Sequence, residues 1–304
     1  MLAAAQQVDI MRRITDQPWP GWEANVHGVK ITLMSSGIAT MILIGVLLPV
    51  VILPLARRYR QVPRGSRNAL EVILLFIRDM VARPALHDHA YRFMPFLATL
   101  FVFVLGMNIA GLIPLESLGE LAGAFIPALR DKPIGGTPTA ILAVTGGLAA
   151  VTLAMVLMVG MRAAAMRLHY HRHLPLAVCA VISPILWVWG LSPRIEGIAG
   201  VILKLPLTVI ELAGVVTRCF ALMIRLFANM ISGHTLLAVF LMLIFQSGLS
   251  FAQTSAPHVF YVFPLCVAAS VGVALLELLV ALIQAYVFTF LTAIFIELAM
   301  EEAH

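Results

Sequence analysis

Ionisable residues recur at a fixed spacing inside one long apolar stretch, residues 204–245. In a helix, seven residues make about two turns, so residues seven apart form one narrow, slowly drifting stripe. A charge inside a membrane helix costs roughly 2.5–3.5 kcal/mol on insertion scales, and such a charge typically marks a pathway for ions or protons. The chemistry that this pattern favours is therefore ion translocation. The residues at the seven-residue spacing are Lys204, Glu211, Arg218 and Arg225.

Arg225 is the strongest single candidate on this stripe. A guanidinium stays protonated at any working pH, so Arg225 can attract a carboxylate but cannot relay a proton. The alternative is an arginine that pairs with an internal acid as a structural brace. Asn229, one turn further along, either orients that arginine or a water molecule, or simply packs.

His234 and Glu277 form a second candidate group. His234 follows Arg225 by nine residues, which places it roughly 13 Å along the helix axis and on about the opposite face. Glu277 stands on a second long helix that returns in the other direction, so both side chains can reach the same half of the membrane. An acid beside an imidazole can exchange protons near neutral pH. The alternative for His234 is a buried histidine whose nitrogens are satisfied by ordinary packing partners.

The amino-acid composition indicates in what environment these residues lie. Of 304 residues, 61% are hydrophobic and 12% charged, against about 45–50% and about 25% in soluble domains. We therefore predict an all-α integral membrane protein with a single membrane domain over residues 1–304. The net charge of +5 comes from basic residues at the ends of apolar spans, where membrane topology explains them and no nucleic acid is needed.

The first part of the chain predicts one crossing and one surface helix. Residues 33–55 are long and apolar enough to span a bilayer. The arginine-rich segment 57–67 that follows predicts a cytoplasmic loop, and hence an extracytoplasmic N-terminus over 1–32. Residues 68–83 are too charged to span and predict an amphipathic helix on the cytoplasmic surface.

Two further spans are predicted at 93–115 and 138–161. The basic segment 161–173 is expected to be a cytoplasmic loop. Its alternating histidines are weak as a metal site, and a solvated basic loop is the alternative. Residues 174–190 are apolar but short and predict a re-entrant or interfacial segment. The alternating histidines are His169, His171 and His173.

Two long helices are predicted at 198–245 and 258–300. Their lengths, roughly 72 Å and 65 Å, are about twice a bilayer. Fitting them into the membrane needs a tilt of about 60°, beyond the usual 0–40° range, and so a protein partner to lean on. The count is then about five crossings, with the C-terminus in the cytoplasm.

Several segments of this sequence resemble subunit a of the F-type ATP synthase, the stator half of its proton channel. They are NALEVILLFIRDMV (68–81), NIAGLIP (108–114), RLFANMISGH, ELLVALIQAY and the MEEAH end. The resemblance implies a rotary motor in a bacterial inner membrane, with a c-ring, peripheral-stalk b subunits, other synthase subunits and membrane lipid as partners. It implies that the two long helices wrap the c-ring, that no cofactor is bound, and that ATP chemistry belongs to partner subunits.

The resemblance also implies roles for single residues. Arg225 matches the essential arginine, and Gln284 matches the glutamine that faces it. In some members the acid and the imidazole occupy each other's positions, which supports one shared function for His234 and Glu277. Glu211 is expected to line the outlet to the cytoplasm, with Arg218 paired to it or to lipid phosphate.

Two other functions remain open from the sequence. A proton-coupled secondary transporter would need inverted repeats and broken helices, and no repeat is visible. A purely structural membrane scaffold would not need the ionisable and amide residues of the two long helices. Co-purification with a ring of small hairpin subunits would separate the stator channel from both.

Overall fold

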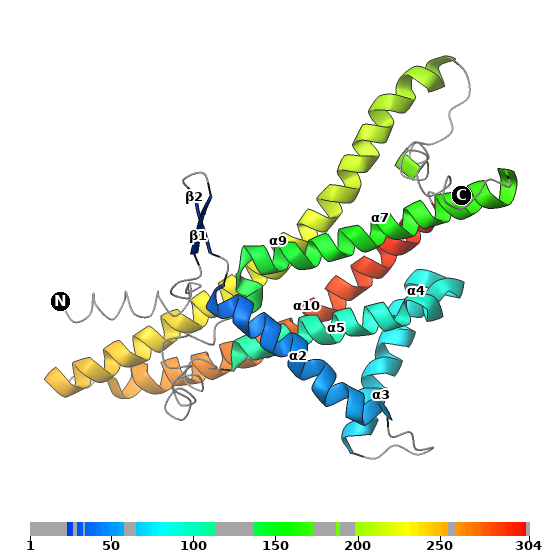
Figure 1. Cartoon of the computed structure of the whole chain (residues 1–304). Coiled ribbons are helices and arrows are strands. Elements are labelled where there is room, and N and C mark those ends of the chain that lie inside the picture. Colours follow the sequence, from blue (N-terminus) through cyan, green and yellow to red (C-terminus); the bar gives the residue numbers. More distant parts are fainter. Residues whose placement is uncertain are drawn as a thin grey trace. The chain divides into compact units, whose positions relative to one another are not determined.

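The computed structural model describes the chain in helices that follow one another from residue 34 to residue 301, coloured in chain order in Figure 1. Apart from one short hairpin, the regular structure of the described residues is helical, which confirms the all-α prediction. The described ranges are 23–26, 29–32, 34–57, 65–113, 137–172, 187–188, 198–254 and 259–301.

Five helical segments among the described residues are long and apolar enough to cross a membrane, which confirms the predicted number. The chain is therefore a multi-pass membrane protein. The segments are Ser36–Pro54, Arg67–Leu112, Leu142–Met166, Lys204–Ile244 and Val262–Met300.

A two-stranded antiparallel sheet near the N-terminus was not foreseen. Strand β1, Glu23–Val26, pairs with β2, Val29–Thr32, in a register that sets Val26 opposite Val29. The β-branched residues of β2 suit a strand, but four-residue strands leave too short a pattern to predict from sequence.

The chain divides into two compact units, each built from separate stretches of sequence. One comprises residues 1–67, 102–145 and 225–285, and the other residues 68–101, 146–224 and 286–304. The longest helices among the described residues are α5 (Ala90–Leu112), α7 (Leu142–Arg172), α9 (Ile198–Thr254) and α10 (Val259–Glu301), and all four pass from one unit into the other.

In the first unit, α2 (Ser36–Arg57) packs closely on the second half of α5 (Ala90–Leu112). A Cβ at Gly106 would lie 3.3 Å from atoms of both Ile44 and Leu48, so glycine permits the close approach. Ser35 precedes α2, and its Oγ accepts a hydrogen bond from the Ile38 N–H at 3.4 Å.

In the second unit, the predicted surface helix at 68–83 is not one regular α-helix. Helix α3 (Ser66–Ile77) continues into a π-helical turn, η1 (Arg78–Ala82), then α4 (Arg83–Leu86) and a 3₁₀ turn, η2 (His87–His89), before α5 begins. Phe76 packs at ring-centroid distances of 6.0 Å from Phe101 and 5.7 Å from Tyr286. This aromatic contact ties α3 to α5 and to α10.

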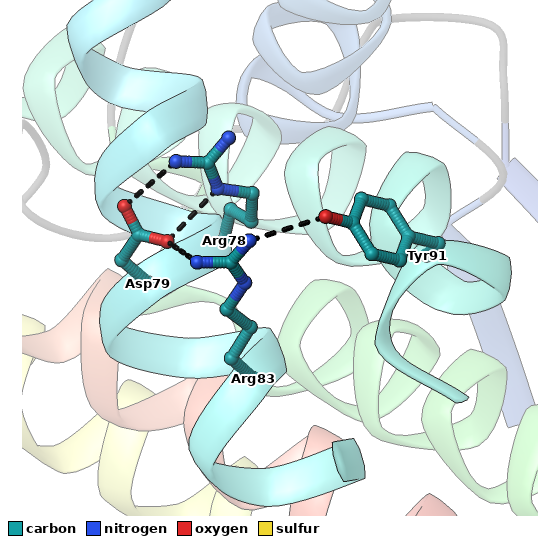
Figure 2. A network of polar contacts seen from close by, with 4 residues as sticks. All are labelled: Arg78, Asp79, Arg83 and Tyr91. Atoms are coloured by element: carbon teal, nitrogen blue, oxygen red, sulfur yellow. Dashed lines mark hydrogen bonds and ion pairs between the residues drawn. The ribbon is translucent and has the colours of Figure 1, made fainter. Parts of the chain in front are cut away.

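A polar network holds the π-helical turn, as Figure 2 shows. Both oxygens of Asp79 accept hydrogen bonds from Arg78, at 2.9 and 3.0 Å, and Oδ1 also accepts one from Arg83 at 3.0 Å. Arg83 in turn donates to the Tyr91 hydroxyl at 3.1 Å. The network therefore links η1 and α4 to the start of α5.

The charges of this network shift one another's titration. The hydrogen bond and charge of Arg78, with the charge of Arg83, hold the pKa of the Asp79 carboxyl below its usual range. The hydrogen bond from Arg83 lowers the pKa of the Tyr91 hydroxyl. Both groups are on the surface, so these shifts describe a local brace rather than a buried charge.

Two of the three remaining helices, α7 and α9, are longer than predicted. Helix α7, Leu142–Arg172, continues through most of the segment 161–173 that was expected to be a loop. That prediction was wrong because the alanines and leucine there are strong helix formers and no glycine or proline interrupts them before Pro175. Helix α9, Ile198–Thr254, extends past the predicted end at 245, and α10 is Val259–Glu301.

Most of the predicted re-entrant segment 174–190 lies outside the described residues, as do the histidine at 173 and residues 1–22. Trp187 is described and buried, packed against Gly160 of α7. A Cβ at position 160 would collide with the indole ring, so only glycine fits there.

Replacing Asp79 tests the brace. A carboxyl with a lowered folded pKa stabilises the fold above its unfolded pKa of about 4, and that contribution is lost as pH falls through the folded pKa. Asp79→Asn should therefore lower the unfolding temperature of the detergent-purified chain by about a degree or two at neutral pH. The two proteins should converge in acid.

Asp88→Asn is the matched control, because Asp88 is exposed and has no ion pair among the described residues. Melting curves recorded by circular dichroism across pH check both variants. Equal effects of the two changes at neutral pH would contradict the assignment of a brace to Asp79.

Candidate functional site

Helix α9 has one face packed against the chain and one face directed away from it. The packed face carries side chains that are nearly inaccessible, at the spacing of a helical stripe. The opposite face is exposed and almost wholly apolar, with Phe220, Ile224 and Ile231 among its members. The packed side chains are Val215, Cys219, Leu222, Leu226 and Met230.

Arg225 lies on the exposed face of α9. Among the described residues it has no ion pair and no hydrogen bond, so none of them provides the internal acid partner of the alternative considered from the sequence. Asn229, one turn further, is half-buried, and its carbonyl accepts a hydrogen bond from the Ser232 hydroxyl at 2.9 Å. The stripe around Arg225 thus combines one permanent charge with a wide apolar surface.

The predicted acid and imidazole meet. Nδ1 of His234 on α9 lies 2.5 Å from Oε1 of Glu277 on α10. Glu277 is 5% exposed, while the His234 side chain is 16% exposed. Neither Glu277 oxygen has a correctly angled hydrogen-bond partner within the described residues. The contact therefore places an acid and an imidazole side by side, with the imidazole on the more open side.

Gly233 makes this contact possible, and the sequence reasoning did not identify it. A Cβ at position 233 would lie 3.0 Å from Oε1 of Glu277 and 3.1 Å from Cδ. Any larger residue would push α9 away from the carboxyl group. The signal in the sequence was a glycine within an otherwise continuous helix, which usually means close approach of another segment.

The face of α10 that carries Glu277 is buried along its length. Ser270 and Gln284, seven residues to either side, are buried with it, as the helical spacing predicts. The Gln284 amide nitrogen is buried and has no hydrogen-bond partner in the described part of the chain. No hydrogen bond joins Gln284 to Arg225 among those residues, so the facing pair implied by the family resemblance is not formed within this chain alone.

Asn108 adds a polar group beside this face. It is 1% exposed on α5, and its amide donates a hydrogen bond of 3.2 Å to the carbonyl of Ala281, one turn after Glu277. Its own Oδ1 is buried without a partner among the described residues. An unsatisfied acceptor at this depth is a place where water can bind.

Glu211 and Arg218 lie on the part of α9 that belongs to the second unit, and both are half-buried. No ion pair joins them among the described residues, because seven residues of helix separate them by roughly 10 Å along the axis. Of the two partners expected for Arg218, the pairing with lipid phosphate stays a prediction. Arg218 instead lines a cavity of about 10 Å³ with Val215 and Cys219, enough for about one water.

Glu297 on α10 is half-buried, and its Oε2 has no hydrogen-bond partner among the described residues. Within those residues no cluster of three or more histidines, cysteines or acids could hold a metal ion.

Comparison with known proteins adds a family to this geometry. Residues 38–297 match the family model described as ATP synthase A chain. The chain is 34% identical over 80% of its length to ATP synthase subunit a of Myxococcus xanthus, covering 64% of that protein. It is 33% identical to the same subunit of Anaeromyxobacter dehalogenans, over 79% of this chain and 50% of that one. For Chloroherpeton thalassium the identity is 32%, over 80% and 60%. The chain thus spans about half to two thirds of the length of these relatives.

A double-mutant cycle tests the close approach at Gly233. Alanine favours a helix over glycine by about 1 kcal/mol, but overpacking a buried contact costs about 1–3 kcal/mol. Gly233→Ala should therefore fail to stabilise the chain, whereas Gly214→Ala, with open space around it on the same helix, should stabilise it. In a Glu277→Ala background Gly233→Ala should behave like the control.

The measurement is thermal unfolding of the purified chain in detergent. If Gly233→Ala stabilises the wild-type background as much as Gly214→Ala does, the close contact with Glu277 is absent.

Proposed function

The chain belongs to the ATP synthase A chain family, and from that premise we propose that it is the proton-translocating stator subunit of an F-type ATP synthase. It forms inlet and outlet half-channels against a c-ring and couples proton flow to ring rotation and ATP synthesis. ATP chemistry resides on other subunits, and peripheral-stalk b subunits hold this subunit still. The site residues are Arg225, His234, Glu277, Gln284, Asn229, Glu211 and Arg218.

The observation that carries the proposal is the exposure of Arg225 on an apolar helix face without an acid partner among the described residues. An arginine facing lipid would cost roughly 2.5–3.5 kcal/mol. A partner that brings a carboxylate to this face removes that cost. A rotating ring that carries one carboxylate per subunit brings a new carboxylate to Arg225 at every step of rotation.

The contact between His234 and Glu277 supports their assignment to the inlet half-channel. A proton arriving through water protonates the imidazole or the carboxyl group, and the short contact between His234 and Glu277 shares it. From there it passes toward a c-ring carboxylate. Asn108 and Gln284 supply buried polar atoms near this path that can hold water.

The outlet is assigned to the part of α9 that carries Glu211 and Arg218. The small cavity beside Arg218 has room for about one water. The half-buried Glu211 carboxyl group can pass a released proton toward the cytoplasm, while the Arg218 guanidinium, which cannot relay a proton, can hold a water beside it. Arg225 separates the two halves because its permanent charge blocks direct proton passage.

The proposed orientation is that of a bacterial inner-membrane protein with its N-terminus outside and its C-terminus in the cytoplasm. The arginine-rich segment 57–67 is then cytoplasmic, in line with the positive-inside rule. The brace at Arg78, Asp79 and Arg83 lies at the same surface, where peripheral-stalk subunits approach.

Exchanging the inlet pair tests its role. Glu277→Gln cannot take up a proton and should slow proton-driven ATP synthesis by about tenfold or more. His234→Glu combined with Glu277→His restores an acid beside an imidazole in the reverse order and should recover part of the rate. ATP synthesis in inverted membrane vesicles under an imposed proton gradient gives the measurement.

Thr235→Ala is the matched control, since Thr235 is exposed beside the pair and its hydroxyl bonds only to the Ile231 carbonyl of its own helix. Normal synthesis by Glu277→Gln would show that the pair is not a proton relay.

Removing the charge at position 225 tests the barrier. An unpaired ionised carboxylate between the half-channels would bear several kcal/mol of desolvation, and the guanidinium offsets it. In Arg225→Ala the ring carboxylate can pass the stator protonated, so protons should cross while synthesis falls about a hundredfold or more. Arg225→Lys keeps a charge but loses the planar fork, and should also fail to couple.

Proton flux and ATP synthesis are measured in the same vesicles, with Arg67→Ala as a control that removes an arginine outside α9. Co-purification of the ring of small subunits verifies assembly of each variant. Normal synthesis by Arg225→Ala in an assembled complex is the result that defeats the proposed function.

A further inference from the structure

An apolar groove of about 470 Å³ lies in the second unit, and none of the residues assigned to proton transfer lines it. It is formed by the beginning of α5, the C-terminal half of the apolar part of α7 and the end of α10. Its volume is in the range of pockets that hold organic ligands of moderate size. The groove lies at the beginning of α5 and at the ends of the apolar segments of α7 and α10, where we expect a membrane to give way to water.

Methionines form much of the groove wall. Met155, Met158, Met161 and Met166 come from α7, and Met300 comes from α10. Methionine side chains are unbranched and polarisable, so a surface made of them adapts to flexible apolar ligands. No acidic residue is among the side chains that line the groove.

Two arginines stand at the groove, Arg92 on α5 and Arg162 on α7. Both are exposed, and neither has an ion pair among the described residues. The guanidinium of Arg92 lies 5.8 Å from the centroid of the Phe93 ring, a contact that holds it at the groove. In the same unit Arg78 and Arg83 are both paired with Asp79. The arginines at the groove are therefore available for an anion from outside the chain.

We propose that this groove binds an anionic phospholipid, with its phosphodiester at Arg92 and Arg162 and an acyl chain along the methionines. A guanidinium group is suited to bind two phosphate oxygens at once. Basic pockets between membrane helices on the cytoplasmic side bind acidic lipid head groups. Each basic residue near the surface raises the preference for an anionic lipid over a neutral one by about tenfold or less. A free phosphate ion alone does not fit the site, because it would leave the apolar wall of the groove without a partner.

Photochemical labelling tests the proposal in the assembled ATP synthase. The complex is reconstituted into phosphatidylcholine vesicles that contain a trace of phosphatidylglycerol with a photoreactive group in its acyl chain. After illumination, mass spectrometry of peptides from this subunit maps the labelled residues. Labelling should concentrate on residues 155–166 of α7, at least about tenfold above labelling by the matching phosphatidylcholine probe.

The variant Arg92→Gln with Arg162→Gln should reduce labelling of α7 by the phosphatidylglycerol probe about 10-fold to 30-fold. The control Arg57→Gln with Arg67→Gln removes the same charge from residues that do not line the groove and should change the labelling by about twofold or less. Since no residue at the groove belongs to the proton path, both variants should assemble and synthesise ATP normally.

Other outcomes overturn the proposal. Equal labelling by the two probes would indicate ordinary bilayer contact without recognition of the head group. Full competition by short-chain glycerol phosphate would indicate an anion site that does not use the groove. Labelling of α7 in the isolated subunit but not in the assembled complex would assign the groove to a protein partner.

Discussion

The cost of an ionised group in an apolar setting is the constraint on which the rest of this structure depends. Two ionisable side chains of the site lower this cost in opposite ways. Glu277 is buried on α10 and finds its partner, His234, within the chain. Arg225 is exposed on α9 and finds none among the described residues. One helix pair thus holds a titratable group with a partner inside the chain and a permanent charge that, in the proposed function, is compensated by another subunit.

Glycine positions decide where the helices can bring such groups together. Gly233 leaves room for the Glu277 carboxyl group, and Gly106 lets α5 lie close against α2. Asn108 on the same helix then reaches the Ala281 carbonyl on α10. In a membrane, where apolar burial does not drive helices together, such close contacts and interhelical hydrogen bonds supply much of the packing energy. Glycines at helix contacts therefore decide which polar and ionisable side chains can come close to one another.

The sequence predicted the helices and the meeting of His234 with Glu277, because apolar length and helical spacing are local properties. It did not predict the π-helical turn at Arg78, since that turn depends on the contacts of Asp79 with two arginines. It took residues 161–172 for a loop because charge was given more weight than helix propensity. Gly233 was overlooked since a glycine acquires its meaning only when the atom opposite it is known.

The arrangement on α9 also limits how a proton can travel. His234 follows Arg225 by nine residues, two and a half turns, so the two side chains leave the helix on opposite sides. In the proposed function, a proton on His234 or Glu277 is then on the packed side of α9, while a ring carboxylate meets Arg225 on the exposed side. The last step of the inlet therefore passes around the helix through water. Asn229 and Ser232 lie within about 40° of Arg225 around the helix axis, so they can hold that water only on the side of Arg225.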